Sequence, residues 1–348
     1  MNTDGYRTHP ARLVKHLIHH EQETALYAQI YGWNPDTLIK TAQDIEKKYP
    51  SFAGIELNIW CPSPKVMACW WWSGMMKDKK KCLDIIKGIS TAISAPFSIK
   101  VRTGLNQEDK QEQFEMLVQA AQYCHTITVH GRTFQQWHSN IVDRDFIYRL
   151  KKEVWAQCKI IGNGGIFSYQ DAVEKQQNLD GIMTAQAAIG DPRVFVDHQP
   201  SLSERYNIII EHLNLSIAYE IWFKKILELY PDNPSDQILL ANKNALHYKK
   251  KIEDDDTLIT TQTQTQIHNY ILPFPKLEDI QKIANTIDSK DENPYRAIIE
   301  FRKYLFNYIK GIPGSKECKQ QIATTKNYSE LYTIITEFFA RTTQEDIL

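Results

Sequence analysis

The first two hundred residues alternate short apolar segments with amphipathic segments of helical period. The apolar segments have the length of strands and are residues 25–30, 54–59, 97–102, 126–130, 159–163 and 181–185. The helical segments between them are residues 35–48, 79–93, 108–123, 143–153 and 168–177. Strict alternation of strands and helices predicts a parallel sheet. Six such strands are compatible with an open doubly wound sheet or with part of a (β/α)8 barrel.

The pattern changes after residue 200. Apolar residues at helical spacing predict helices at 202–229, 294–309 and 329–339, in addition to a short helix at 9–19. Residues 231–292 are polar and biased in composition, which indicates an insertion or a linker. We therefore expect an α/β domain over residues 1–200 and an all-helical domain over residues 201–348, with a polar insertion at about 231–292.

Composition restricts both the class of protein and the kind of site. At 348 residues the chain can bury a sizeable core, and its net charge of −1 gives no global positive field, so RNA binding would need a local patch. The six cysteines form no CxxC motif and no metal-ligand spacing, so we expect neither a disulfide framework nor a metal site. No apolar run reaches about eighteen residues, the length of a membrane span. We expect a soluble, cytoplasmic monomer.

One predicted strand leads into a cysteine. Strand 54–59 breaks into a loop at Cys61-Pro62, and barrel enzymes hold reactive side chains at the C-terminal ends of strands. A lone cysteine is otherwise more often a small buried apolar residue. Asn58, two further residues and Cys61-Pro62, followed by Ser-Pro-Lys-Val at 63–66, resemble the signature of the tRNA-dihydrouridine synthases. This resemblance implies an FMN-binding (β/α)8 barrel, a helical tRNA-binding domain after it, and NADPH as reductant.

The resemblance also implies roles for Cys61 and Asn58. In this family, reduced flavin delivers hydride to C6 of a flipped uracil, and the loop cysteine donates a proton to C5. A thiol suits that step because its ordinary pKa of about 8.5 leaves it mostly protonated at neutral pH. We therefore expect Cys61 to be catalytic and Asn58 to contact the substrate.

Other strand ends supply the flavin contacts that the resemblance implies. The flavin ring would be contacted by Gln29, Lys100 and His130, the last of which begins a His-Gly-Arg motif. Loops after the last two strands of a barrel commonly bind phosphate. The residues expected in those loops are Asn163, Gly164, Gly165, Ala185 and Gln186. Because the family usually has Gly-Arg at the last two of these positions, we expect flavin binding to be weaker here.

Two cationic side chains lie two residues apart on one predicted strand. Lys100 and Arg102 lie on the same side of strand 97–102 near its end, where two positive charges rarely occur without an anionic partner. By resemblance Arg102 faces the RNA substrate; the alternative is an ordinary Lys-x-Arg pair at a solvated strand end. The lysine groups 79–81 and 249–251 are expected to be solvated faces. In the helical domain, the expected contacts with the tRNA backbone are Arg302, Lys303, Lys310, Lys316 and Lys319.

The barrel that the resemblance implies is incomplete in this sequence. If strand 54–59 is the family's fourth strand, the chain begins after the second. A barrel that lacks two of its eight strands has two open edges. Our hypothesis is that Met1 is an internal or misassigned start and that coding sequence continues upstream. The alternative is a truncated pseudo-enzyme.

The tryptophans are unusual in number and position. Five of the eight, at 60, 70, 71, 72 and 137, fall where the family has or tolerates glycine. Glycine loops allow close backbone approach or positive φ, and an indole side chain prevents both. The 14 glycines are few for 348 residues, and eight more would restore the usual share of roughly 7 per cent. We hypothesise that these tryptophans are UGA codons that encode glycine; the alternative is a real surface that stacks on RNA bases.

These patterns together predict a tRNA-dihydrouridine synthase, a flavin-dependent oxidoreductase that reduces the C5=C6 bond of uridine in tRNA. Two other functions are compatible with parts of the sequence. One is an FMN-barrel oxidoreductase that acts on a small molecule, which a helical domain without tRNA affinity would favour. The other is a non-catalytic RNA-binding remnant, which the absence of upstream barrel strands would favour.

Overall fold

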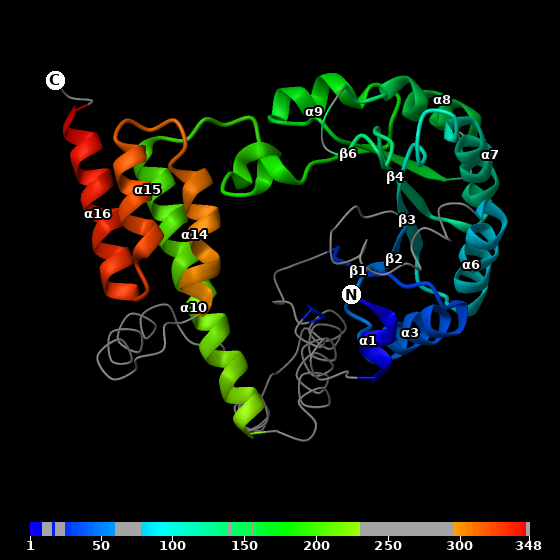
Figure 1. Cartoon of the computed structure of the whole chain (residues 1–348), viewed down its shortest axis with the longest axis horizontal. Coiled ribbons are helices and arrows are strands. Elements are labelled where there is room, and N and C mark those ends of the chain that lie inside the picture. Colours follow the sequence, from blue (N-terminus) through cyan, green and yellow to red (C-terminus); the bar gives the residue numbers. More distant parts are fainter. Residues whose placement is uncertain are drawn as a thin grey trace, which may run out of the picture. The chain divides into compact units, whose positions relative to one another are not determined.

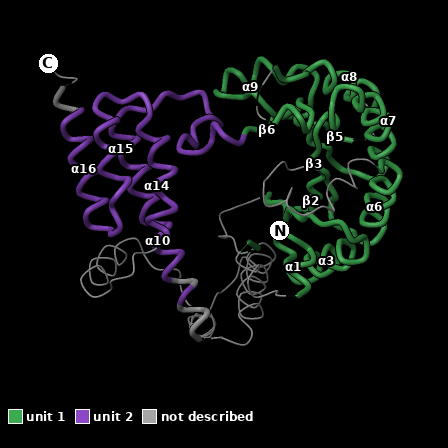
Figure 2. Tube along the Cα trace, viewed as in Figure 1, with its two compact units in different colours: residues 1–184, 233–258 green, residues 185–232, 259–348 purple. Residues whose placement is uncertain are grey.

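The computed structural model describes residues 1–8, 16–17, 25–59, 78–137, 139, 141–154, 156, 158–229 and 296–345 of the 348-residue chain. These residues form two compact units (Figure 2): those within 1–184, and those within 185–229 and 296–345. The domain boundary predicted after residue 200 stays a prediction. The predicted insertion at 231–292, the candidate Cys61 and the tryptophans at 60 and 70–72 lie outside the described residues.

The first unit contains a six-stranded parallel sheet. Its strands are β1 (Tyr27–Ile30), β2 (Gly54–Asn58), β3 (Phe97–Arg102), β4 (Thr126–His130), β5 (Lys159–Asn163) and β6 (Gly181–Met183). Each strand pairs with the next strand in the chain. A doubly wound sheet reverses its strand order at one point, whereas sequential parallel pairing is the order of a (β/α)8 barrel. Of the two arrangements left open by the sequence, the structure favours the barrel.

Helices lie along one side of the sheet, one before β1 and the others after successive strands (Figure 1). They are α1 (Thr3–Thr8), α3 (Pro35–Lys48), α6 (Lys79–Ala92), α7 (Lys110–Ala120), α8 (Arg144–Val154) and α9 (Tyr169–Gln176), with the 3-10 helix η2 (Ala121–Tyr123) after α7. Figure 1 shows α3, α6, α7 and α8 following one another along the outer side of the curved sheet. α3 begins where it does because the Asn34 side chain accepts hydrogen bonds from two main-chain N–H groups and Pro35 occupies the first turn.

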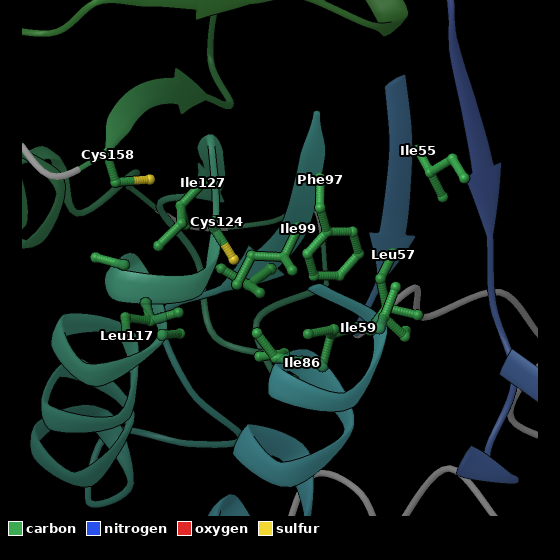
Figure 3. Packing of buried hydrophobic residues seen from close by; sticks show 14 of the residues in the cluster. Ile55, Leu57, Ile59, Ile86, Phe97, Ile99, Leu117, Cys124, Ile127 and Cys158 are labelled. Atoms are coloured by element: carbon green, nitrogen blue, oxygen red, sulfur yellow. The ribbon is translucent and has the colours of Figure 1, made fainter. Parts of the chain in front are cut away.

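The hydrophobic core of this unit lies between the strands and the helices. Every second strand residue contributes to it, and Leu57 of β2 and Ile99 of β3 are both fully buried. Ile86 of α6 and Leu117 of α7 project into the same cluster (Figure 3). Side chains on one face of a strand recur every two residues, and those on one face of a helix recur about every 3.6 residues. Burial of one face of each element in this core therefore explains both apolar periods in the sequence.

Most of the intervening strand residues are polar and point to the other face of the sheet, because successive side chains in a strand alternate. The face they form carries carboxylate, amide, hydroxyl, ammonium and imidazole groups. Its residues are Gln29, Glu56, Asn58, Ser98, Lys100, Arg102, Thr128, His130 and Asn163. A parallel sheet with one apolar face toward the helices thus places polar chemistry on the opposite face.

The second unit is helical. Its elements are η3 (Gln186–Ala188), η4 (Pro192–Phe195), α10 (Leu202–Leu229), α14 (Arg296–Tyr308), α15 (Ser315–Thr324) and α16 (Tyr328–Glu345). Its core contains Leu213 of α10, Phe301 and Leu305 of α14, and Leu331 of α16, all buried. Among the described helices, none is long and apolar enough to cross a membrane.

Most predicted elements agree with the structure to within a few residues. The predicted helix 9–19 lies almost wholly outside the described residues. α1 and α15 were not predicted, and α16 begins one residue before the predicted 329–339 and continues to Glu345. The expectation that two further strands precede β1 stays a prediction.

Candidate active site

Five polar side chains lie near the carboxyl ends of five neighbouring strands. They are Gln29 of β1, Asn58 of β2, Lys100 of β3, His130 of β4 and Asn163 of β5. The register pairs Asn58 with Lys100 and His130 with Asn163. Because all strands are parallel, their carboxyl ends lie at the same end of the sheet, where these residues form a staggered line. The structure therefore places at one end of the sheet side chains that are up to 134 positions apart in the sequence.

Glu56 joins two of these side chains and was not among the predicted site residues. Its Oε1 accepts a 2.5 Å hydrogen bond from Nε2 of Gln29, and Oε1 of Gln29 accepts a 3.1 Å bond from Nδ2 of Asn58. Burial raises the pKa of Glu56 above its ordinary value, against the lowering effects of the Gln29 hydrogen bond and the Lys100 charge. The alternation of Glu56 with Asn58 in a buried strand was the signal that could have identified it.

Arg102 is buried and supports the loop after β4. Its side chain is only 3% exposed, and its Nη1 donates to the main-chain oxygens of Thr133 at 3.0 Å and Trp137 at 2.7 Å. These bonds hold residues 131–137 against the end of β3. The contact with RNA that the resemblance implies for Arg102 stays a prediction; the described bonds give it a structural role.

His130 ends β4 and is buried. Its Nε2 lies 3.2 Å from Nη1 of Arg132, and because a guanidinium can only donate, Nε2 is the acceptor in this contact. The following residue, Gly131, donates its N–H to the main-chain oxygen of Asn163 at 3.1 Å. Within the His-Gly-Arg motif, the side chains of His130 and Arg132 therefore contact each other, and the main chain of Gly131 binds the end of β5.

The loop after β5 is held by cations. Asn163 donates from Nδ2 to the main-chain oxygen of Met183 at 2.8 Å, which ties β5 to β6. Nη2 of Arg144 donates to the main-chain oxygens of Gly164 at 3.0 Å and Gly165 at 3.3 Å. The pKa of Arg132 is lowered by burial and, second, by the charge of Arg144. Two guanidinium groups that repel each other at this edge favour the binding of an anion.

Gly164 has a conformation and surroundings that exclude a side chain. Its φ is +104°, and a Cβ atom there would lie 2.6 Å from Cδ2 of the His130 ring. We expect Gly164→Ala to lower the free energy of unfolding by about 1–3 kcal/mol, through backbone strain and displacement of the ring. Urea denaturation measures this cost.

Gly311 provides a control for the close approach at Gly164. It has a φ of +83°, but no atom lies within 4 Å of a Cβ built on it. Gly311→Ala therefore carries the cost of strain without the clash and is expected to be milder. Equal costs for the two variants would show that contact with His130 does not constrain position 164.

The remaining predicted residues are placed as follows. Ala185 and Gln186 follow β6, and both are exposed, with Gln186 beginning η3. In the helical unit, Lys303, Lys310 and Lys316 are exposed, whereas Arg302 and Lys319 are half-buried. Arg302 also donates from Nη1 to the main-chain oxygen of Ala323. Of the lysine groups expected to be solvated, Lys79 is buried, and residues 249–251 lie outside the described residues.

The four cysteines of the described residues do not resemble reactive thiols. Cys82, Cys124, Cys158 and Cys318 are all buried and without disulfide partners. Burial raises the pKa of Cys82 and of Cys158 to about 12 and that of Cys318 to about 11. Within the described part of the chain, no group of His, Cys, Asp or Glu side chains is arranged to hold a metal ion.

Comparison with known proteins assigns the chain to a family. The family described as dihydrouridine synthase matches residues 1–229, more than half of the sequence. The chain belongs to the dihydrouridine synthase family. The family predicted from Asn58 and Cys61-Pro62 is confirmed. The predicted α/β fold of (β/α)8 type, followed by helices, is confirmed with it, since this is the fold of the dihydrouridine synthases.

Relatives of this dihydrouridine synthase family member come from bacteria and eukaryotes. A probable tRNA-dihydrouridine synthase of Rickettsia conorii is 30% identical over 220 residues, which are 60% of this chain and 65% of that protein. The tRNA-dihydrouridine synthase B of Pasteurella multocida is 28% identical over 228 residues, 61% of this chain and 67% of that protein. The tRNA-dihydrouridine(47) synthase [NAD(P)(+)] of Coprinopsis cinerea is 29% identical over 220 residues, 58% of this chain and 32% of that protein. The chain thus spans about 65% of the length of the Rickettsia relative.

Proposed function

We propose that this chain is a tRNA-dihydrouridine synthase that uses FMN as cofactor and NADPH as reductant. The observation that carries the proposal is the line of Gln29, Asn58, Lys100, His130 and Asn163 along the carboxyl edge of the sheet. The names of the relatives support it, since each contains tRNA-dihydrouridine synthase and that of Coprinopsis cinerea adds NAD(P)(+). The edge offers amide, ammonium and imidazole groups to one ligand.

The residues present fit a flavin mononucleotide. Its pyrimidine ring carries both hydrogen-bond donors and acceptors, and the amides of Gln29 and Asn58 supply both kinds of partner. Its phosphate requires positive charge and close backbone approach. Arg132, Arg144 and the positive-φ Gly164 supply these after β4 and β5. The donor set therefore suits the cofactor that the family uses.

Each predicted residue has a role in the proposed enzyme. Gln29, Lys100 and His130 hold the flavin ring, and Asn163, Gly164, Gly165, Ala185 and Gln186 hold its phosphate. FMN, once reduced by NADPH, supplies the hydride for C6 of the uracil. Cys61 holds the proton that is transferred to C5, and Asn58 and Arg102 orient the substrate. A base in a folded tRNA must be flipped out to reach such a site.

The direct test combines FMN, NADPH and an unmodified tRNA transcript with the purified chain. Mass spectrometry of the digested tRNA is expected to show uridine residues that are heavier by two hydrogens. NADPH oxidation that does not depend on tRNA, without any change in the tRNA, would instead favour an oxidoreductase that acts on a small molecule. tRNA binding without FMN binding would favour the non-catalytic remnant.

The backbone at Trp137 supports the hypothesis that some tryptophans stand at glycine positions. Trp137 has a φ of +52°, in the left-handed region that favours glycine, and its side chain is 41% exposed. Its main-chain oxygen is held by Arg102. We propose that the protein made by its native cells has glycine at positions 60, 70, 71, 72 and 137, and we call this sequence the glycine form.

Trp137→Gly is expected to raise the free energy of unfolding by about 1 kcal/mol, because it removes the strain of a bulky residue in a left-handed conformation. Urea denaturation measures the change. Trp33 is the matched control: it packs against the core, its ring centroid lies 3.6 Å from Nζ of Lys81, and it is not among the described residues with positive φ. Trp33→Gly should destabilise the protein. A destabilising effect at both positions would contradict a glycine site at 137.

A further inference from the structure

Glu56 occupies the centre of a short chain of hydrogen bonds on the polar face of the sheet. It is 9% exposed, and the register places it directly opposite Gln29 on β1 and Ser98 on β3. Its carboxylate accepts from the Gln29 amide, which in turn accepts from the Asn58 amide. The predicted roles of Gln29 and Asn58 both depend on which end of each amide faces the ligand.

A carboxylate determines that orientation because an ionised carboxylate can only accept hydrogen bonds. If the Gln29 amide were reversed, its oxygen would face the Glu56 carboxylate, and two acceptors would oppose each other. The nitrogen of Gln29 must therefore point to Glu56, and its oxygen then faces Nδ2 of Asn58 at 3.1 Å. Asn58 is fixed in the same way, with its nitrogen toward Gln29.

We propose that Glu56 is a positioning residue that fixes the order of hydrogen-bond donors and acceptors offered by Gln29 and Asn58 to the flavin ring and the substrate base. Both ligands carry an imide, in which an N–H lies between two carbonyl oxygens. An imide binds well only to partners in the complementary order. Glu56 touches neither ligand in this account and acts through the two amides.

A second contribution comes from charge. Burial raises the pKa of Glu56, and the positive charge of Lys100 partly opposes that rise. On β3, Ser98 lies opposite Glu56, and Lys100, two residues later, lies opposite Asn58. Glu56 and Lys100 therefore lie on neighbouring strands of the polar face with opposite charges, which attract each other. This interaction favours a fixed ammonium position beside the two amides.

The inference rests on the proposed function, and FMN titration tests it separately. The glycine form and its Glu56→Gln, Gln29→Ala and double variants are titrated with FMN, and quenching of flavin fluorescence gives each dissociation constant. Glu56→Gln keeps the size of the side chain, but its amide can present either an oxygen or a nitrogen to Gln29. We expect FMN binding about tenfold weaker, equivalent to the loss of one net hydrogen bond of about 1.4 kcal/mol.

The double variant distinguishes positioning from a general structural role. If Glu56 acts through Gln29, its replacement has little effect once Gln29 is alanine, and the two losses are not additive. Additive losses would overturn the inference. Glu56→Asp keeps the charge but shortens the side chain by one methylene, so it should also weaken binding. Thermal unfolding of the FMN-free variants confirms that each is folded.

Ser98→Ala is the matched control. Ser98 lies opposite Glu56 on the neighbouring strand, is buried, and its hydroxyl has no hydrogen-bond partner within the described part of the chain. Its replacement should leave FMN binding unchanged. An unchanged FMN affinity of the Glu56→Gln variant would overturn the inference but not the proposed function. Absence of FMN binding by the glycine form itself would overturn the proposed function, and the inference with it.

Discussion

Replacing Cys61 with alanine is expected to slow dihydrouridine formation by about 10²–10⁴-fold, the range that a positioned general acid contributes. The proton for C5 of the uracil would then have to come from water, which is not held in place. FMN binding should not change, because the predicted cofactor contacts come from other strand ends. The rate is measured by mass spectrometry of tRNA digested at successive times.

Cys82 provides the control for this prediction. It is a buried cysteine of α6, and burial raises the pKa of its thiol to about 12. Cys82→Ala removes a thiol of the same chain without touching the predicted site, so the rate should be retained. A Cys61→Ala variant that forms dihydrouridine within twofold of the parent rate would contradict the role of Cys61 as proton donor.

Asp109→Ala is expected to lower the free energy of unfolding by about 3–5 kcal/mol, the cost of breaking a buried ion pair by removing one partner. Oδ2 of Asp109 lies 2.9 Å from Nζ of Lys79, and the two side chains are 15% and 7% exposed. The same oxygen accepts a 2.6 Å hydrogen bond from the N–H of Leu105. The pair joins the start of α6 to the loop before α7. Urea denaturation measures the loss.

A double variant and a surface control test how charge and burial contribute to the stability that Asp109 provides. Asp109→Asn combined with Lys79→Met keeps an acceptor for Leu105 and removes both charges, so it should be much less harmful than Asp109→Ala. Asp44, whose exposed ion pair with Arg7 is 3.0 Å long, is the surface control. Asp44→Ala should cost about 1 kcal/mol or less. Equal costs at Asp44 and Asp109 would show that burial of the second pair does not matter.

The alternation of strands and helices was readable from the sequence because both carry strong apolar periods. α3 matches its prediction at both ends, since Asn34 and Pro35 mark its start. α15 was missed because it buries only Cys318 and Ile322, and its other residues are mostly polar. An apolar period with two members over ten residues is too weak to indicate a helix.

The predicted site residues followed from strand ends and from resemblance to a family. Glu56 did not, because its importance depends on a bond to Gln29, which is 27 positions away in the sequence. The supporting role of Arg102 depends in the same way on the main-chain oxygens of Thr133 and Trp137, 31 and 35 positions away. Contacts between strands of this kind are set by register, which the sequence pattern alone does not provide.

The most direct test of the proposed enzyme is the dihydrouridine content of tRNA in a bacterium without dihydrouridine synthases of its own. The glycine form is expressed in this host, and its total tRNA is digested and analysed by mass spectrometry. Dihydrouridine is expected to appear with the glycine form and to be lost with its Cys61→Ala variant. Absence of dihydrouridine in cells whose purified protein carries FMN would contradict the proposed function.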